Sequence, residues 1–93
     1  MEKMNENEIN TALRELQGWS YKNGSIIKSF KFKDFKEAFS TMTRIAFECE
    51  AQNHHPNWEN VYNTLNIALT THDAGGVTQK DIALAKSIEN LVG

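Results

Sequence analysis

Hydrophobic residues recur at the spacing of one helical face in three stretches of the chain. The first covers residues 9–16 and is followed by Gly18, a residue that often ends helices. The second is the longest and starts at Asp34, which forms a capping-box pattern with Glu37 three residues later. The third follows residue 78. The second stretch has a wide apolar face that a sheet or a partner must cover, and it consists of Phe35, Ala38, Phe39, Met42, Ile45, Ala46 and Cys49.

Apolar and polar residues alternate in two further regions, and this pattern predicts two β-hairpins. The first covers residues 19–33 and turns at Asn23-Gly24, because both residues tolerate the positive φ angles of a two-residue turn. The second has strands at residues 58–62 and 65–72. In its last strand one face would carry Leu65, Ile67 and Leu69, and the other would carry Asn66, Ala68, Thr70 and His72.

The predicted element order is therefore α-β-β-α-β-β-α within a single domain that spans residues 1–93. Two hairpins can join into a four-stranded antiparallel sheet with one face covered by the three helices, so we predict an α+β fold. The polar and small residues on the other sheet face would suit the lining of a cleft. Because so short a chain buries a modest share of its surface, we also expect a homodimer or homotetramer.

Composition limits the classes of partner. A formal net charge of −2 argues against direct binding to a nucleic-acid backbone, which requires clustered Lys and Arg. The chain has no signal-peptide pattern and no apolar run of about 20 residues, so we expect a cytoplasmic protein without a membrane partner. The single cysteine, Cys49, rules out an internal disulfide and a multi-cysteine metal site.

The three histidines of the chain fall within residues 54–72 and form the candidate site. His54 and His55 lie where Pro56 should end the second helix, around residues 53–54. This pair leads into the strand that should pair with the one ending at His72, so the three side chains can converge. Histidine exchanges protons near neutral pH. Zinc or iron binding is an alternative, but compact ligand spacings are missing, so metal-free acid–base catalysis fits better. A helix-end cap is a further alternative for the histidine pair.

Three other residues are candidates for the same site. Glu50 precedes His54 by one helical turn, so a carboxylate–imidazole contact is geometrically available. Asp81 would occupy the third position of a helix capped by Thr78, and capping alone could also explain it. Trp58 is either a core aromatic residue or a wall on which a flat ring stacks.

The spacing of these residues resembles the signature of the pterin-4a-carbinolamine dehydratases. The similarity covers residues 9–92, and the family fold agrees with the predicted element order. The matching segments are His54-His55-Pro56-Asn57-Trp58, Asn60-Val61-Tyr62-Asn63, Leu69-Thr70-Thr71-His72 and Asp81, with Gly18-Trp19 and Lys33-Asp34-Phe35 upstream.

The resemblance implies a hydro-lyase that removes water from 4a-hydroxytetrahydropterin to give quinonoid dihydropterin. Such an enzyme recycles the pterin cofactor of aromatic amino acid hydroxylases and itself uses no metal and no organic cofactor. The three histidines would be catalytic: His54 and His72 would act on the departing hydroxyl, and His55 would also bind and orient the pterin. The residues that would support substrate binding are Asp81, Glu50 and Trp58. Asn53 stands where the family often has a carboxylate.

Two other classes of function stay open at this point. Some members of the family act as dimerisation cofactors, and so as transcriptional coactivators, for a homeodomain transcription factor through a helix surface. The sequence neither favours nor excludes that role. The other class is a small histidine-based metal-binding module.

The acid–base interpretation predicts a metal-free protein. Elemental analysis of protein purified without chelator should find well under one metal ion per chain, and a chelator should leave catalytic activity unchanged. Stoichiometric zinc or iron together with inhibition by the chelator would contradict acid–base chemistry by the histidines alone.

Overall fold

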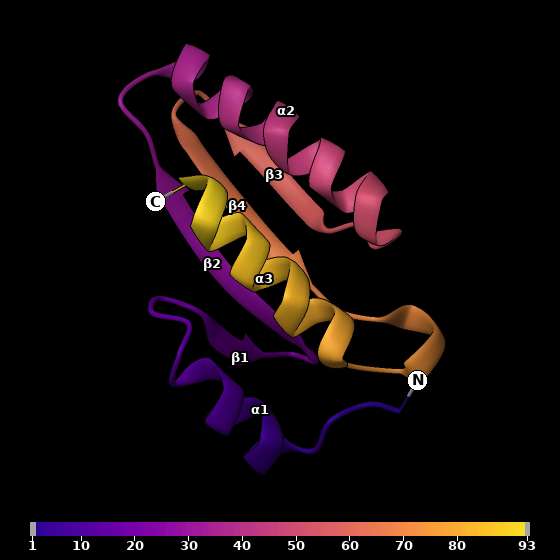
Figure 1. The fold of residues 1–93 in the computed structure, drawn as a ribbon. Helices are drawn as coiled ribbons and strands as arrows, with labels where there is room; N and C mark the ends of the chain where they lie inside the picture. The colour runs from indigo at the N-terminus through magenta and orange to yellow at the C-terminus, as the bar shows by residue number, and fades with distance from the viewer. Residues whose placement is uncertain (1, 93) are drawn as a thin grey trace.

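The computed structural model describes residues 2–92 and contains the predicted elements in the predicted order. Their bounds are α1 (Glu6–Leu13), β1 (Ser20–Lys22), β2 (Ser25–Lys31), α2 (Phe35–Gln52), β3 (Asn57–Val61), β4 (Thr64–Leu69), the short 3-10 helix η1 (His72–Ala74) and α3 (Gln79–Val92). Figure 1 shows this arrangement from the side of the helices.

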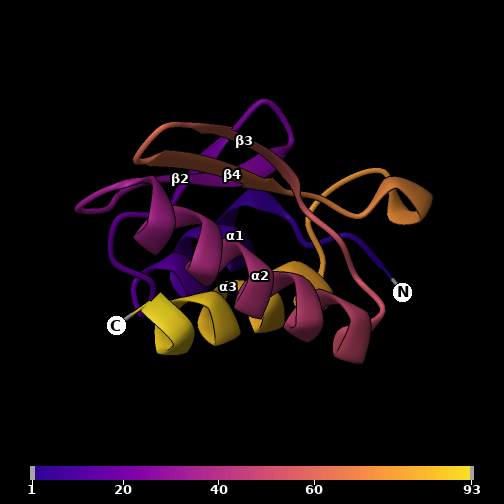
Figure 2. The same ribbon diagram turned by 90° about the horizontal axis from the view of Figure 1, so that it is seen from above.

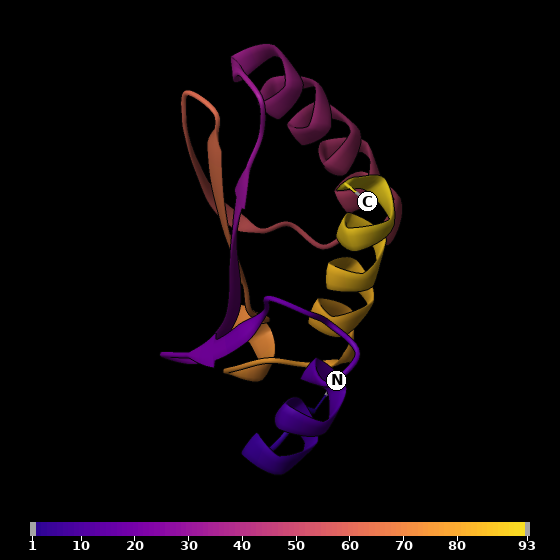
Figure 3. The ribbon, with the colours of Figure 1, turned by 90° about the vertical axis from the view of Figure 1, so that its left-hand side faces the viewer.

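The four strands form one antiparallel sheet in the order β1-β2-β4-β3. The three helices lie on one face of this sheet, as Figures 2 and 3 show from two further directions. The predicted α+β class and the one-sided helical cover are thus confirmed. No described element covers the opposite face of the sheet.

The core lies between the sheet and the helices, and the strand alternation explains its composition. Leu65, Ile67 and Leu69 of β4 are all buried, as the sequence pattern predicted. The register places Ile26 of β2 opposite Leu69 and Phe30 opposite Leu65, so both central strands present apolar side chains to the helices. Burying one such side chain stabilises the fold by roughly 1.5–3 kcal/mol.

Helix α2 buries a narrower stripe than the sequence pattern predicted. Its buried residues are Ala38, Thr41, Ile45 and Cys49. Phe35 and Phe39, which we placed in the covered face, are 45% and 55% exposed, and Phe47 is 72% exposed. The rings of Phe35 and Phe39 stack on each other with centroids 5.5 Å apart. Because α2 buries only that narrow stripe of residues, these aromatic side chains remain exposed on the rest of the helix surface.

The prediction that the last strand reaches His72 was wrong. Strand β4 ends at Leu69, and the backbone of Thr71 bonds within the following loop. The Thr71 N–H donates to the Gly76 carbonyl at 2.9 Å, and the Thr71 carbonyl accepts from Ala74 at 3.1 Å and Gly75 at 3.0 Å. These bonds satisfy the Thr71 backbone groups within the loop. His72 therefore begins the turn of η1 instead of ending a strand.

Helix α2 ends where the sequence predicted, and Asn53 determines how the chain leaves it. Asn53 has φ 52° and ψ 44°, a left-handed conformation that asparagine adopts more readily than most residues. Its N–H donates to the Glu50 carbonyl at 3.2 Å, and the N–H of His54 donates to the Cys49 carbonyl at 3.0 Å. This pair of bonds is a Schellman motif, which fixes the position of His54 relative to the helix end.

Changing Asn53 to alanine should lower the free energy of unfolding by about 1 kcal/mol, because a Cβ without a compensating polar group disfavours left-handed backbone angles. The Asn53→Gly variant should stay within about 0.5 kcal/mol of the natural protein. Urea denaturation measures both changes. Asn10→Ala, at an exposed site inside α1, is the matched control and should not be destabilised. Equal stability of the Asn53→Ala and Asn53→Gly proteins would refute this role for the left-handed turn.

Candidate functional site

The site is built on the segment between α2 and β3, where His54 follows the Schellman motif. The His54 side chain is only 10% exposed. Its Nε2 lies 2.5 Å from Oδ1 of Asp81, which is at the start of α3 and is 0% exposed. The structure thus joins two of the predicted site residues, although 26 residues separate them in the chain.

The other oxygen of the Asp81 carboxylate also has partners. Oδ2 accepts hydrogen bonds from the backbone N–H of Thr78 and from the hydroxyl of Thr71, both at 2.8 Å. The hydroxyls of Thr71 and Thr78 lie 2.8 Å apart. Asp81 therefore caps α3 and also contacts a histidine. A buried carboxylate needs such partners because an unpaired buried charge is costly.

His55 points to a different environment. Its side chain is 56% exposed, and its Nε2 lies 2.5 Å from Oε2 of Glu50, which is 75% exposed. We predicted a contact between Glu50 and His54, and the structure pairs Glu50 with His55 instead. The reason is the left-handed turn at Asn53, which takes His54 off the helical position that the i, i+4 spacing assumed.

His72 is exposed on η1, and its ring makes no hydrogen bond within residues 2–92. It directly follows Thr71, whose hydroxyl binds Asp81. His72 is therefore adjacent in sequence to the hydrogen-bonded group that holds His54. No hydrogen bond joins the two histidines in the described part of the chain.

Trp58 packs as a core residue and is also one of the residues that line a cavity at the sheet surface. It is half-buried and packs against the hydrophobic core, whereas its neighbours Asn57 and Glu59 are exposed on β3. Tyr62, which belongs to the matching segments, lies in the turn at the other end of β3 and is 63% exposed. The strand therefore separates Tyr62 from the histidine pair.

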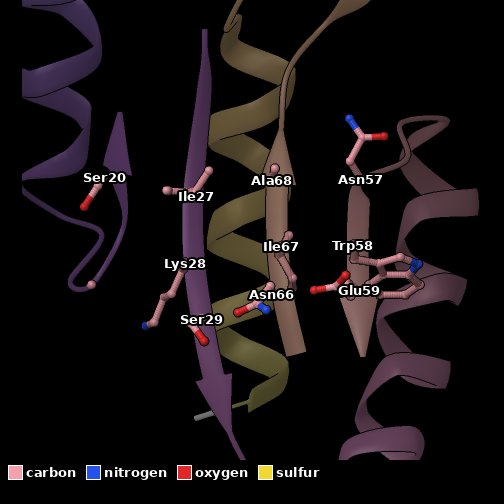
Figure 4. A pocket seen from close by; sticks show the side chains of 11 residues that line it. Ser20, Ile27, Lys28, Ser29, Asn57, Trp58, Glu59, Asn66, Ile67 and Ala68 are labelled. Carbon is pink, nitrogen blue, oxygen red and sulfur yellow. The ribbon is translucent and has the colours of Figure 1, made fainter. Parts of the chain in front are cut away.

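A cavity of about 580 Å³ lies at the sheet surface. Figure 4 shows its lining on all four strands, with α3 behind them. Asn66 and Ala68 line it as expected, while the hydroxyl of Thr70 donates to the Gly24 carbonyl at 2.9 Å. Cavities of this size accept small organic molecules. The polar and small lining residues are Gly18, Ser20, Lys28, Ser29, Asn57, Glu59, Asn66 and Ala68.

The remaining titratable and metal-binding features are limited. Residues 2–92 contain no cluster of three or more His, Cys, Asp or Glu side chains that could hold a metal ion. Burial raises the pKa of the Cys49 thiol to about 11, so this cysteine stays protonated near neutral pH and is a poor nucleophile. Among the same residues no helix is long and apolar enough to cross a membrane.

Chemically, the site offers one imidazole held by a buried carboxylate and two exposed imidazoles. The first can be oriented for proton transfer, as in other carboxylate–histidine pairs. Our sequence reasoning assigned no role to Thr71, although it lies inside a matching segment directly before His72. The signal that could have identified it is a hydroxyl residue between a buried strand and a histidine, within reach of a capped helix start.

Comparison with known proteins supports the fold and identifies a family whose model spans nearly the whole chain. The family model described as pterin 4 alpha carbinolamine dehydratase matches residues 2–91. A protein from Christiangramia forsetii is 59% identical over 92 residues, covering 99% of this chain and 95% of the relative. One from Solibacter usitatus is 53% identical over 89 residues, covering 96% and 94%. Both are named "Putative pterin-4-alpha-carbinolamine dehydratase".

A solved structure from another organism has the same fold as this chain. The crystal structure of a transcriptional coactivator/pterin dehydratase from Brucella melitensis has a TM-score of 0.95 and 42% sequence identity to this chain. The match covers 98% of this chain and 99% of that one.

Proposed function

Since this chain belongs to the pterin 4 alpha carbinolamine dehydratase family, we propose that it removes water from 4a-hydroxytetrahydropterin and releases quinonoid dihydropterin. In this role it would return the oxidised pterin of aromatic amino acid hydroxylases to the recycling pathway. The observation that carries the proposal is the pairing of His54 with the buried carboxylate of Asp81. That the protein works in the cytoplasm stays a prediction from the sequence.

The reaction requires two proton movements. The bond between C4a and the hydroxyl oxygen breaks as this oxygen receives a proton, and the oxygen leaves as water. The electron pair of a ring nitrogen forms the new C=N double bond, and a ring N–H proton is lost to a base. Atoms and electrons balance without an external oxidant. General acid–base catalysis by positioned imidazoles suits such a reaction at neutral pH.

We assign the two proton movements to His54 and His72. The carboxylate of Asp81 orients the ring of His54, as a buried acceptor does for a catalytic imidazole. His72 is exposed and free of hydrogen bonds within the described residues, so its ring can approach a bound substrate. His55, oriented by Glu50, would bind the pterin from the solvent side. Trp58 would support the start of β3 from the core.

The direct test is dehydration of chemically generated carbinolamine with and without the protein. If His54 and His72 transfer protons, alanine at either position should lower kcat by about 10²–10⁴-fold. Alanine at His55 should mainly raise KM, because a binding contact acts on ground and transition states alike. Steady-state kinetics and pterin titration of the three variants measure these effects.

The double variant His54→Ala/His72→Ala should be slower than either single variant, since two acids near one hydroxyl can partly replace each other. Wild-type turnover in the double variant would reject the mechanism. A binding defect at His54 with normal turnover would show that the roles of His54 and His55 are exchanged.

A second candidate role, as a protein-interaction module, is favoured by the outer surface of α2. Phe35, Phe39 and Phe47 are large, apolar and exposed on this helix, and exposed apolar patches commonly mark protein interfaces. The occupant that we propose is a second copy of this chain, giving a homodimer or homotetramer. The solved relative described as a transcriptional coactivator makes a different protein the alternative occupant.

Replacing both Phe39 and Phe47 with serine should shift the protein towards monomer at micromolar concentration, as measured by sedimentation. Tyr21→Ser, at an exposed aromatic residue on β1, is the matched control and should leave the oligomer unchanged. A natural protein that sediments as a monomer would count against self-association, as would an oligomer insensitive to the double replacement.

A further inference from the structure

Four polar residues from three segments form one hydrogen-bonded group around the Asp81 carboxylate. They are His54 after α2, Thr71 after β4, and Thr78 with Asp81 at the start of α3. These segments lie at the same end of the molecule in Figures 1 and 2. We refer to these residues as the Asp81 group.

The direction of each hydrogen bond in the Asp81 group follows from which atoms carry protons. The Thr78 N–H can only donate, so Oδ2 of Asp81 accepts from it. The Thr71 hydroxyl donates its single proton to the same oxygen, and its own oxygen must then accept from the Thr78 hydroxyl. The Thr78 oxygen in turn accepts from the Lys80 N–H at 3.2 Å. The two threonines therefore hold the carboxylate as an acceptor on its Oδ2 side.

This arrangement determines the protonation pattern of His54. Oδ1 of Asp81 lies 2.5 Å from Nε2 of His54, and because an ionised carboxylate can only accept hydrogen bonds, that nitrogen must carry a proton. A neutral imidazole has one N–H, so Nδ1 carries the lone pair. Nδ1 has no hydrogen-bond partner, and within residues 2–92 no buried side-chain nitrogen or oxygen lacks one. Nδ1 must therefore be accessible to solvent, as part of the 10% of the His54 side-chain surface that is exposed.

We propose that Nδ1 of His54 is the nitrogen that exchanges protons, and that Thr71 is a positioning residue that orients Asp81 and thereby keeps Nε2 of His54 protonated. The statement about proton exchange during catalysis rests on the proposed function. The statement about which nitrogen of His54 is protonated concerns the ligand-free protein, and it can be tested without any activity. Thr71 would act through Asp81 and His54, without touching the substrate.

Replacing Asp81 with asparagine gives the sharpest test, because the network dictates which way the amide turns. The amide oxygen must face the Thr78 N–H and the Thr71 hydroxyl, both donors. The amide NH₂ then faces His54 and requires a lone pair on Nε2. His54 should therefore change from the Nε2–H tautomer to the Nδ1–H tautomer, and its exposed nitrogen would lose its lone pair.

The tautomer is read from ¹⁵N chemical shifts of the histidine ring in the ligand-free protein, at a pH where the ring is neutral. The natural protein should show a protonated Nε2, and the Asp81→Asn protein a protonated Nδ1. A natural protein with its proton on Nδ1 would overturn the proposal, and so would an Asp81→Asn protein with an unchanged tautomer.

Variants of Thr71 test the positioning role separately. Thr71→Val removes the hydroxyl and should lower kcat by about 10–100-fold with KM nearly unchanged, as expected for a misplaced catalytic group. Thr71→Ser keeps the hydroxyl and should recover kcat to within about 3-fold of the natural protein. Thr70→Val is the matched control, because the neighbouring hydroxyl bonds to Gly24 on another part of the structure. Its kcat should not change.

The outcomes separate the positioning role from the proposed function. Equal losses in Thr71→Val, Thr71→Ser and Thr70→Val would show a general packing effect and would overturn the role of Thr71. A natural protein that fails to dehydrate the carbinolamine would refute the proposed function, while the ring ¹⁵N shifts would still decide the tautomer. If Thr71→Val fails to fold, the Thr71→Ser kinetics and the Asp81→Asn tautomer decide the proposal.

Discussion

Burial of the Asp81 carboxylate is the constraint on which the arrangement of this end of the molecule depends. A fully buried carboxylate is tolerated only when its oxygens have hydrogen-bond donors. The donors come from the start of α3, from the loop after β4 and from the segment after α2. One side chain therefore connects three segments that are distant in sequence, and it gives His54 a fixed partner.

The left-handed turn at Asn53 makes this connection possible. If helical geometry continued past Gln52, His54 would project from the helix beside Glu50. The Schellman motif redirects the chain, so that His54 meets Asp81 and the exposed His55 meets Glu50. Two adjacent imidazoles thus receive different surroundings, one largely buried and the other open to solvent. That difference is the physical basis for giving them different roles.

The two faces of the sheet have different surroundings in the structure. The inner face supplies the buried side chains that hold the helices, and its tight packing leaves little freedom for change. The outer face carries small and polar residues around a cavity. The outer surface of α2 is a third region, where exposed phenylalanine side chains remain uncovered by the sheet and α3. The cavity, the Asp81 group and the outer surface of α2 are therefore three separate regions of one small fold.

The sequence by itself determined the elements, their order and the buried face of the strands, because these follow from local periodicity and turn preferences. The Asn23-Gly24 turn and the alternation of Leu65 and Ile67 are examples. The spacing of the histidines and Asp81 likewise indicated the family. Only the tertiary structure decided which carboxylate meets which histidine and where β4 ends. Those features depend on the left-handed angles at Asn53 and on hydrogen bonds of Thr71 to distant residues, which no local pattern encodes.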